Sequence, residues 1–189
     1  TRQLQERETD LAKEKSRLDL VIHEIPLGIS LFNQDFELDL ANRQFCDIMR
    51  FPAELSAAGT PFEAFIRHNA ERGEYGPGDI EEQIRARCEL ARQAKFHRFE
   101  RIRPDGTAIE VIGNPTPDGG FVATYLDITS RTRAEAALRI SEARFRDLAD
   151  KSSDIVWHLW FEPQPHFHYV SPSAESILVY PPAFFLDDF

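Results

Sequence analysis

The side chains best suited to chemistry are six histidines and two cysteines, and their spacing points to no catalytic centre. His166 and His168 alternate along a predicted strand and therefore share one face, and His158 lies on the strand predicted before it. Three imidazoles so arranged could hold a metal ion such as zinc. We expect polar surface histidines instead and assign no metal. Cys46 and Cys88 fit no metal or disulfide spacing, which predicts reduced thiols.

The sequence lacks the short motifs of the common enzyme classes. It has no nucleophile elbow, and the glycine-rich loop at 73–79 lacks the Lys-Ser/Thr pair of a phosphate-binding loop. The net charge is −10 and the basic residues form no cluster, which argues against a nucleic-acid partner. We therefore predict no catalytic residues in this chain, which is not itself expected to be an enzyme.

Composition predicts a substantial core and no membrane segment. The 189 residues include 15 phenylalanines, and no apolar run approaches the length of a bilayer-spanning helix. No signal peptide is visible, so we expect a cytoplasmic location. The chain begins at Thr1 and ends at Phe189, which we interpret as a piece of a longer protein that could be anchored in a membrane upstream.

Two turn motifs divide residues 95–129 into three short strands. Pro-Asp-Gly-Thr at 104–107 is typical of a tight hairpin, because proline presets φ and Asp-Gly supplies positive φ. A longer loop at 115–120 has the same turn chemistry. The segments 108–113 and 121–128 are rich in β-branched and aromatic side chains, which predicts an antiparallel meander.

The segment before the meander predicts two strands and three helices. Asn42 is typical of a helix N-cap, and Thr60 with Glu63 is typical of a capping box at the start of the next helix. The apolar periodicity and the turn residues place the two strands and then the three helices at 28–33, 36–41, 43–50, 61–72 and 80–93.

A long helix is expected on each side of this region, at 1–23 and at 130–152, and Thr129 is expected to be the N-cap of the second. Along the first, an apolar residue recurs every seven positions at Leu4, Leu11, Leu18 and Ile25. Along the second, a more complete stripe is formed by Ala134, Leu138, Ser141, Phe145 and Leu148. Both stripes predict pairing with a second copy of the chain as a coiled coil. For the first helix, a solvated helix without a partner is the competing interpretation.

This order of elements resembles the PAS sensor family. The most specific match is Asp-Ile-Thr at 127–129 followed by Arg131, which closes the meander and leads into the second long helix. The resemblance implies an α+β fold in which a five-stranded antiparallel sheet and flanking helices occupy residues 24–129. Residues 153–189 repeat the order strand, strand, capped helix, and resemble the beginning of a second PAS domain.

The resemblance also implies two functional features. Asp127, Ile128, Thr129 and Arg131 would form a joint that ties the last strand to the departing helix, with Arg131, Arg101 or Arg103 as the ionic partner of Asp127. A small-molecule pocket would lie between the sheet and the helices, and its candidate lining residues are Phe45, Met49, Phe62, Phe65, Ile84, Val111 and Tyr125. The competing interpretation is that these side chains fill the core and nothing binds.

The cofactors of the family give no clear match. Some relatives bind haem through a histidine, and His68 and His97 are the candidates here, but His68 is expected to face solvent and we do not expect haem. Light-sensing relatives set a flavin-reactive cysteine in Asn-Cys-Arg-Phe-Leu-Gln, whereas this chain has Asn-Arg-Gln-Phe-Cys at 42–46, so we reject flavin photochemistry. The cofactor, if any, is unknown, and none is required.

The resemblance implies the input portion of a bacterial signalling protein. We expect a sensory module of a two-component sensor histidine kinase, paired with a second copy through both long helices. A ligand, or the state of the upstream helix, would shift the sheet, and the joint at 127–129 would pass the change to a downstream kinase domain. Three alternatives stay open: a diguanylate cyclase as the output, a gas or redox sensor with a coloured cofactor, and a dimerisation scaffold without a ligand.

Overall fold

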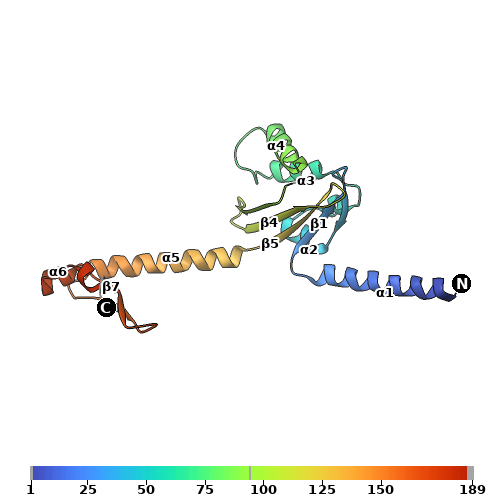
Figure 1. The fold of residues 1–189 in the computed structure, drawn as a ribbon. Coiled ribbons are helices and arrows are strands. Elements are labelled where there is room, and N and C mark those ends of the chain that lie inside the picture. The colour runs from blue at the N-terminus through green and yellow to red at the C-terminus, as the bar shows by residue number, and fades with distance from the viewer. Residues whose placement is uncertain (1, 94, 187–189) are drawn as a thin grey trace. The chain divides into compact units, whose positions relative to one another are not determined.

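Figure 1 shows the computed structural model of the chain, which describes residues 2–93 and 95–186. The chain divides into two compact units, residues 1–130 and residues 131–189. Within the described ranges, every helix is too short or too polar to cross a lipid bilayer. The cytoplasmic location stays a prediction.

The first unit contains a five-stranded antiparallel sheet with the strand order β2-β1-β5-β4-β3 (Figure 1). β1 (Gly28–Phe32) pairs with β2 (Leu38–Ala41) on one side and with β5 (Phe121–Asp127) on the other. β4 (Ala108–Pro115) lies between β5 and β3 (His97–Ile102), so the last three strands form the predicted meander. The predicted α+β fold with a five-stranded antiparallel sheet and flanking helices is confirmed.

The helices of this unit are α1 (Arg2–Glu24), α2 (Arg43–Met49), α3 (Phe62–Glu71) and α4 (Ile80–Arg92), with a short 3-10 turn at Ala53–Ser56. Asn42 caps α2 as predicted, because its Oδ1 accepts a hydrogen bond from the backbone nitrogen of Phe45 at 3.0 Å. The predicted capping role of Thr60 is wrong. Its hydroxyl donates to the carbonyl of Ala57 at 2.7 Å, and Pro61 takes the N-cap position of α3.

The core of the first unit is built from phenylalanine rings on one face of the sheet. Phe32 on β1 stacks on Phe121 on β5, with 4.8 Å between ring centroids. It also meets the rings of Phe62 and Phe65 of α3 edge-on, at 5.2 Å and 5.5 Å. A neighbouring face of α3 packs on α4 through a second apolar cluster, formed by Ile66, Ala70, Ile84 and Cys88, and Phe62 contacts both clusters. α3 therefore lies between the sheet and α4, as Figure 1 also shows.

The end of α1 is attached to the domain through one buried side chain, Asn42. Only 1% of Asn42 is exposed. Its Nδ2 donates to the carbonyls of Ile22 and Leu27 at 2.8 Å and 2.7 Å, and its Oδ1 accepts from the backbone nitrogen of Ile29 at 2.8 Å. One amide thus joins the last turn of α1, the first residues of β1 and the start of α2.

The apolar stripe of α1 faces solvent over its described part. Leu11 and Leu18 are exposed, and Ile25, just beyond the helix, is half-buried. The side chain of Leu4 lies outside the described residues. An exposed stripe of this kind suits a helix that pairs with a second copy, and that pairing stays a prediction.

The second unit consists of most of α5 (Thr129–Asp150), a hairpin and two short helices. The hairpin is formed by β6 (Trp157–Trp160) and β7 (His166–Val170), and α6 (Ser173–Leu178) and α7 (Pro182–Leu186) follow it. This is the predicted order of strand, strand and helix. Its large apolar side chains remain exposed, among them Leu138, Phe145, Leu148, Trp157, Trp160 and Phe161. That this unit begins a second PAS domain stays a prediction, and residues 187–189 of that segment lie outside the described ranges.

Candidate functional site

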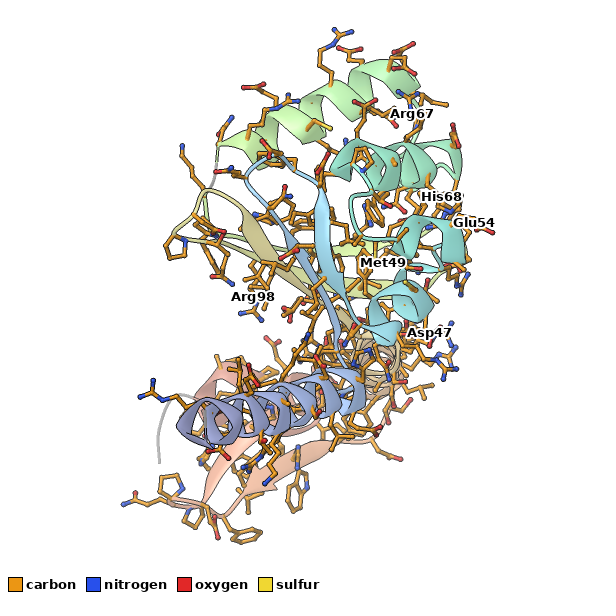
Figure 2. All side chains as sticks on the ribbon, turned by 90° about the vertical axis from the view of Figure 1, so that its right-hand side faces the viewer. Asp47, Met49, Glu54, Arg67, His68 and Arg98 are labelled. Atoms are coloured by element: carbon orange, nitrogen blue, oxygen red, sulfur yellow. The ribbon has the colours of Figure 1, made fainter. Side chains whose placement is uncertain are left out.

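A cavity of about 520 Å³ lies in the first unit between the sheet and helices α2, α3 and α4. This volume is within the range of small-molecule sites, about 300–1,000 Å³. Met49 extends from the end of α2 toward the strands, and Figure 2 shows it beneath α3, which carries Arg67 and His68. The interior wall is apolar and aromatic, and is formed by Phe32, Phe45, Met49, Phe51, Phe62, Phe65, Val111, Phe121, Ala123 and Tyr125.

Two small residues of the sheet leave room for their neighbours on this face. Ala123 on β5 presents only a methyl group to the cavity, between the larger side chains of Phe121 and Tyr125. Gly113 on β4 lies under the imidazole of His97, and a Cβ atom added at Gly113 would be 2.1 Å from that ring. The His97 ring can therefore lie flat on the strands, stacked on Phe99 with 6.0 Å between centroids.

The structure places six of the seven candidate pocket residues in the cavity wall, namely Phe45, Met49, Phe62, Phe65, Val111 and Tyr125. The seventh, Ile84, is not in the wall, and this corrects the prediction. Residues 84 and 88 lie one helical turn apart on the face of α4 that packs against α3. The neighbouring face of α4 reaches the cavity through Arg87, Leu90 and Ala91 instead.

Charged and polar side chains line the mouth of the cavity. The Cζ atom of Arg87 lies 3.5 Å from the centroid of the Tyr75 ring, and that of Arg101 lies 5.1 Å from the same centroid. Lys95 and Glu100 also line this end. Burial lowers the pKa of the Arg87 guanidinium, and the nearby charge of Arg101 contributes in the same direction.

A buried carboxylate behind the mouth pairs with three arginines. The side chain of Glu74 is 4% exposed and forms an ion pair with Arg72, and its oxygens lie 3.0 Å from Arg101 and 3.5 Å from Arg103. Arg72 and Arg103 also donate to the carbonyls that end α2, those of Met49 and Ile48, at 2.9 Å and 2.7 Å. This cluster connects the loop after α3, strand β3 and the C-terminus of α2.

Sequence reasoning missed the Glu74 cluster. The signal was a single glutamate inside a glycine-rich loop, together with Arg101 near the end of a strand and Arg103 just after it. Arg101 and Arg103 form ion pairs with Glu74, and a pairing of either arginine with Asp127 stays a prediction. Arg131 lies 3.9 Å from Glu135 on α5, and its pairing with Asp127 stays a prediction.

The joint at 127–129 ties β4 to the start of α5. The Oγ1 of Thr129 accepts a hydrogen bond from the backbone nitrogen of Ala108 at 3.0 Å, and the nitrogen of Ile128 donates to the carbonyl of Ala108 at 2.9 Å. Asp127 Oδ1 accepts from the backbone nitrogen of Thr129 at 2.8 Å. Thr129 is thus the first residue of the helix and not its N-cap, because its hydroxyl is directed to the neighbouring strand.

The histidines lie at separate places. His97 is in the cavity wall, and the ring of His68 packs against Phe51 with 5.7 Å between centroids. In the second unit, the rings of His158 and His168 are 5.8 Å apart. Over residues 2–93 and 95–186, His, Cys, Asp and Glu side chains form no group of three that could hold a metal ion. That the chain needs no haem, flavin or metal stays a prediction.

The sheet, the cavity and the helix that leaves β5 define an α+β domain with an internal ligand-sized space. The family model described as PAS fold matches residues 22–136, which is more than half of the chain. This chain therefore belongs to the PAS family, and the predicted family assignment is confirmed. A PAS domain is a sensory module and not a catalytic one.

Three solved structures that resemble this chain are distant from it in sequence. The PAS domain of an HTR-like protein from Haloarcula marismortui is 21% identical, with 66% of this chain and 99% of that chain covered and a TM-score of 0.45. The PAS domain of BvgS from Bordetella pertussis is 16% identical, with 70% and 98% covered and a TM-score of 0.45. A domain of a sensory box sensor histidine kinase/response regulator from Geobacter sulfurreducens is 14% identical, with 62% and 96% covered and a TM-score of 0.40. A search of the curated proteins found no match.

Proposed function

We propose that this chain is the sensory and signal-relay PAS module of a bacterial two-component sensor histidine kinase. The observation that carries the proposal is the hydrogen bond from Ala108 to Thr129, which attaches the start of α5 to the sheet that also forms the cavity wall. A movement of that sheet is passed directly to the departing helix.

The cavity and the joint share two neighbouring strands. Val111 on β4 and Tyr125 on β5 both line the cavity and face each other in the register of the sheet. Ala108 lies three residues before Val111, and Thr129 lies four residues after Tyr125. If a ligand binds one arrangement of these strands more tightly than another, it favours the conformation of the joint that belongs to that arrangement. The size of the shift is set by the difference between the two affinities.

The upstream helix offers a second route of input. Because Asn42 donates to the carbonyls of Ile22 and Leu27, a rotation of α1 changes hydrogen bonds at the start of β1 and α2. We propose that α1 and α5 each pair with the same helix of a second copy. Pairing would bury the exposed leucines of α1 and the exposed residues Leu138, Phe145 and Leu148 of α5, and would pass the signal to a downstream kinase domain.

The test is signalling by the parent kinase with Thr129→Val. Valine keeps the β-branched shape and removes the hydroxyl, so the hydrogen bond to Ala108 is lost while the fold is kept. We expect the autophosphorylation rate of the variant to lose its dependence on the stimulus. Thr124→Val is the matched control, since Thr124 lies on β5 on the face away from the cavity, and its kinase should respond as the wild type does. A normal response by Thr129→Val would refute the relay.

The alternatives differ from this proposal at separate points. A parent that makes cyclic di-GMP would replace the kinase by a diguanylate cyclase and leave the relay through Thr129 unchanged. A dimerisation scaffold that binds no ligand is expected to have a filled core, whereas this core contains a cavity of about 520 Å³.

A further inference from the structure

We propose that the cavity binds a small molecule with an apolar, ring-containing body and one anionic group, a carboxylate or a phosphate. The body would lie among the phenylalanines of the interior, and the anionic group would lie at the mouth beside Arg87 and Arg101. This inference rests on the proposed sensory function and specifies the class of ligand.

The interior wall favours an apolar body. Phenylalanine rings from β1, β5, α2 and α3 surround the space, and a ligand that displaces water from them gains about 25 cal/mol for each Å² of apolar surface buried. The hydroxyl of Tyr125 reaches this region, but it lies 3.3 Å from the hydroxyl of Ser30 and the two are partners. This hydroxyl of the wall is therefore paired within the protein, and a ligand needs no polar group to satisfy it.

The mouth carries a net positive charge. Arg87, Lys95 and Arg101 line the described part of this end, against the single carboxylate of Glu100. Arg101 forms an ion pair with Glu74 at 3.0 Å, but Glu74 also pairs with Arg72 and Arg103. Three guanidinium groups therefore share one carboxylate. An anion at this place would be attracted by all of these cations.

Arg87 is the cation at the mouth that is best placed to bind an anionic group of a ligand. No carboxylate of the described residues forms an ion pair with it, and its guanidinium lies over the ring of Tyr75, with 3.5 Å between Cζ and the ring centroid. A guanidinium held against an aromatic ring can still bind a carboxylate or phosphate through two parallel hydrogen bonds. Burial lowers the pKa of Arg87 and the charge of Arg101 adds to this shift, whereas Tyr75 opposes it.

A cationic ligand fits this mouth poorly. The Tyr75 ring, which could otherwise attract a cation, already lies against Arg87 and has Arg101 at 5.1 Å. A neutral polar ligand would leave the Arg87 charge without a partner. Both observations favour an anionic group over the other two classes.

The experiment is isothermal titration calorimetry of this chain with three probes of one shape: 1-naphthaleneacetate, 1-naphthyl phosphate and the neutral 1-naphthaleneacetamide. At least one anion should bind about tenfold more tightly than the amide, equivalent to about 1.4 kcal/mol. The preferred anion identifies a carboxylate or a phosphate as the headgroup. Arg87→Gln should weaken that anion about tenfold and leave the amide unchanged. Arg85→Gln is the matched control, because Arg85 is exposed on the same helix, and it should bind as the wild type does.

Ala91→Trp tests the location of the probes. Ala91 is half-buried on α4 in the cavity wall, so a tryptophan there should block the mouth and abolish binding while the circular dichroism spectrum is retained. Binding that survives Ala91→Trp, equal binding of anion and amide, an unchanged affinity in Arg87→Gln, or no binding of any probe would each overturn the proposal. A failure of the proposed relay would look different from a failure of this ligand proposal. If the relay is wrong, the chain still binds the anion, and the parent kinase carrying Thr129→Val still responds to the stimulus.

Discussion

The hydroxyl oxygen of Thr129 lies 3.0 Å from the backbone nitrogen of Ala108, so the first residue of α5 accepts a hydrogen bond from the first residue of β4. The carbonyl of Ala108 accepts in turn from the backbone nitrogen of Ile128 at 2.9 Å. Both backbone polar groups of Ala108 are thus engaged by the segment that starts the helix. Since the side chain of Ile128 is also buried, that segment cannot shift without moving β4.

Thr129→Val should loosen this attachment in a way that hydrogen exchange detects. The Ala108 amide loses its acceptor, which costs about 1 kcal/mol and corresponds to roughly fivefold faster exchange if local opening controls the rate. NMR exchange of the Ala108 amide measures this directly. Thr124→Val should leave that amide at the wild-type rate. Equal Ala108 exchange in wild type and Thr129→Val would show that the hydroxyl does not hold the joint.

Asn42→Asp should destabilise the first unit by about 2–4 kcal/mol. The variant keeps an acceptor for the backbone nitrogens of Ile29 and Phe45 but loses the amide donor, so a buried carboxylate would face the carbonyls of Ile22 and Leu27. Urea unfolding followed by far-ultraviolet circular dichroism measures the change.

Asn33→Asp is the matched control for Asn42→Asp. Asn33 lies in an exposed turn, and its Oδ1 accepts from the backbone nitrogens of Asp35 and Glu37 at 2.9 Å and 3.0 Å. An aspartate there keeps both hydrogen bonds, so its unfolding curve should match the wild type. If the two variants were equally stable, Asn42 would not be the attachment of α1.

The elements of the fold could be predicted because their signals are local. The Pro-Asp-Gly-Thr turn at 104–107 separates β3 from β4, and Asn42 starts α2, where the sequence places them. The family signature at 127–129 located the joint, but the partner of Thr129 is a strand residue 21 positions away. Local capping rules cannot tell whether the threonine hydroxyl will bond to a backbone nitrogen of its own helix or to one of a distant strand.

The other differences between the sequence-based predictions and the structure also come from tertiary packing. Ile84 has the hydrophobic spacing of a pocket residue, yet α4 turns that face toward α3, so the helix reaches the cavity with Arg87. The anchoring role of Glu74 depends on arginines in and just after β3 and on carbonyls of α2 that are close only in the folded chain. Periodicity indicates which face is apolar but not which neighbour covers it.

Glu74→Gln should cost about 2–4 kcal/mol of stability, because it removes the shared carboxylate and leaves Arg103 buried without an anion. Burial already lowers the pKa of Arg103, and the charge of Glu74 opposes that shift. Urea unfolding by circular dichroism gives the loss. Glu81→Gln removes an exposed ion pair with Arg67, which Figure 2 shows on α3, and should stay close to the wild-type midpoint. Comparable losses in both variants would contradict an anchoring role for Glu74.

Tyr125→Phe should protect the first unit against alkaline unfolding. Burial raises the pKa of Tyr125 to about 12, above the usual 10.0 expected in the unfolded chain, although the hydrogen bond to Ser30 opposes the shift. Between pH 10 and 12 the unfolded chain therefore ionises this phenol while the folded chain does not. The unfolded state then binds fewer protons, so the stabilisation is complete below about pH 10 and is lost as the pH rises toward 12.

The free energy of unfolding of the wild type should thus fall by about 2–3 kcal/mol relative to Tyr125→Phe between about pH 9 and pH 12. Urea unfolding by circular dichroism at both values measures this difference. Tyr169→Phe is the control from the second unit, where burial and then Asp150 raise the pKa of Tyr169 to about 12. Tyrosinate absorbance near 295 nm should lose one late-titrating phenol in each variant, but only Tyr125→Phe should change the alkaline stability of the sheet. An alkaline loss as large in Tyr125→Phe as in the wild type would mean that a group other than this phenol of the cavity wall is responsible.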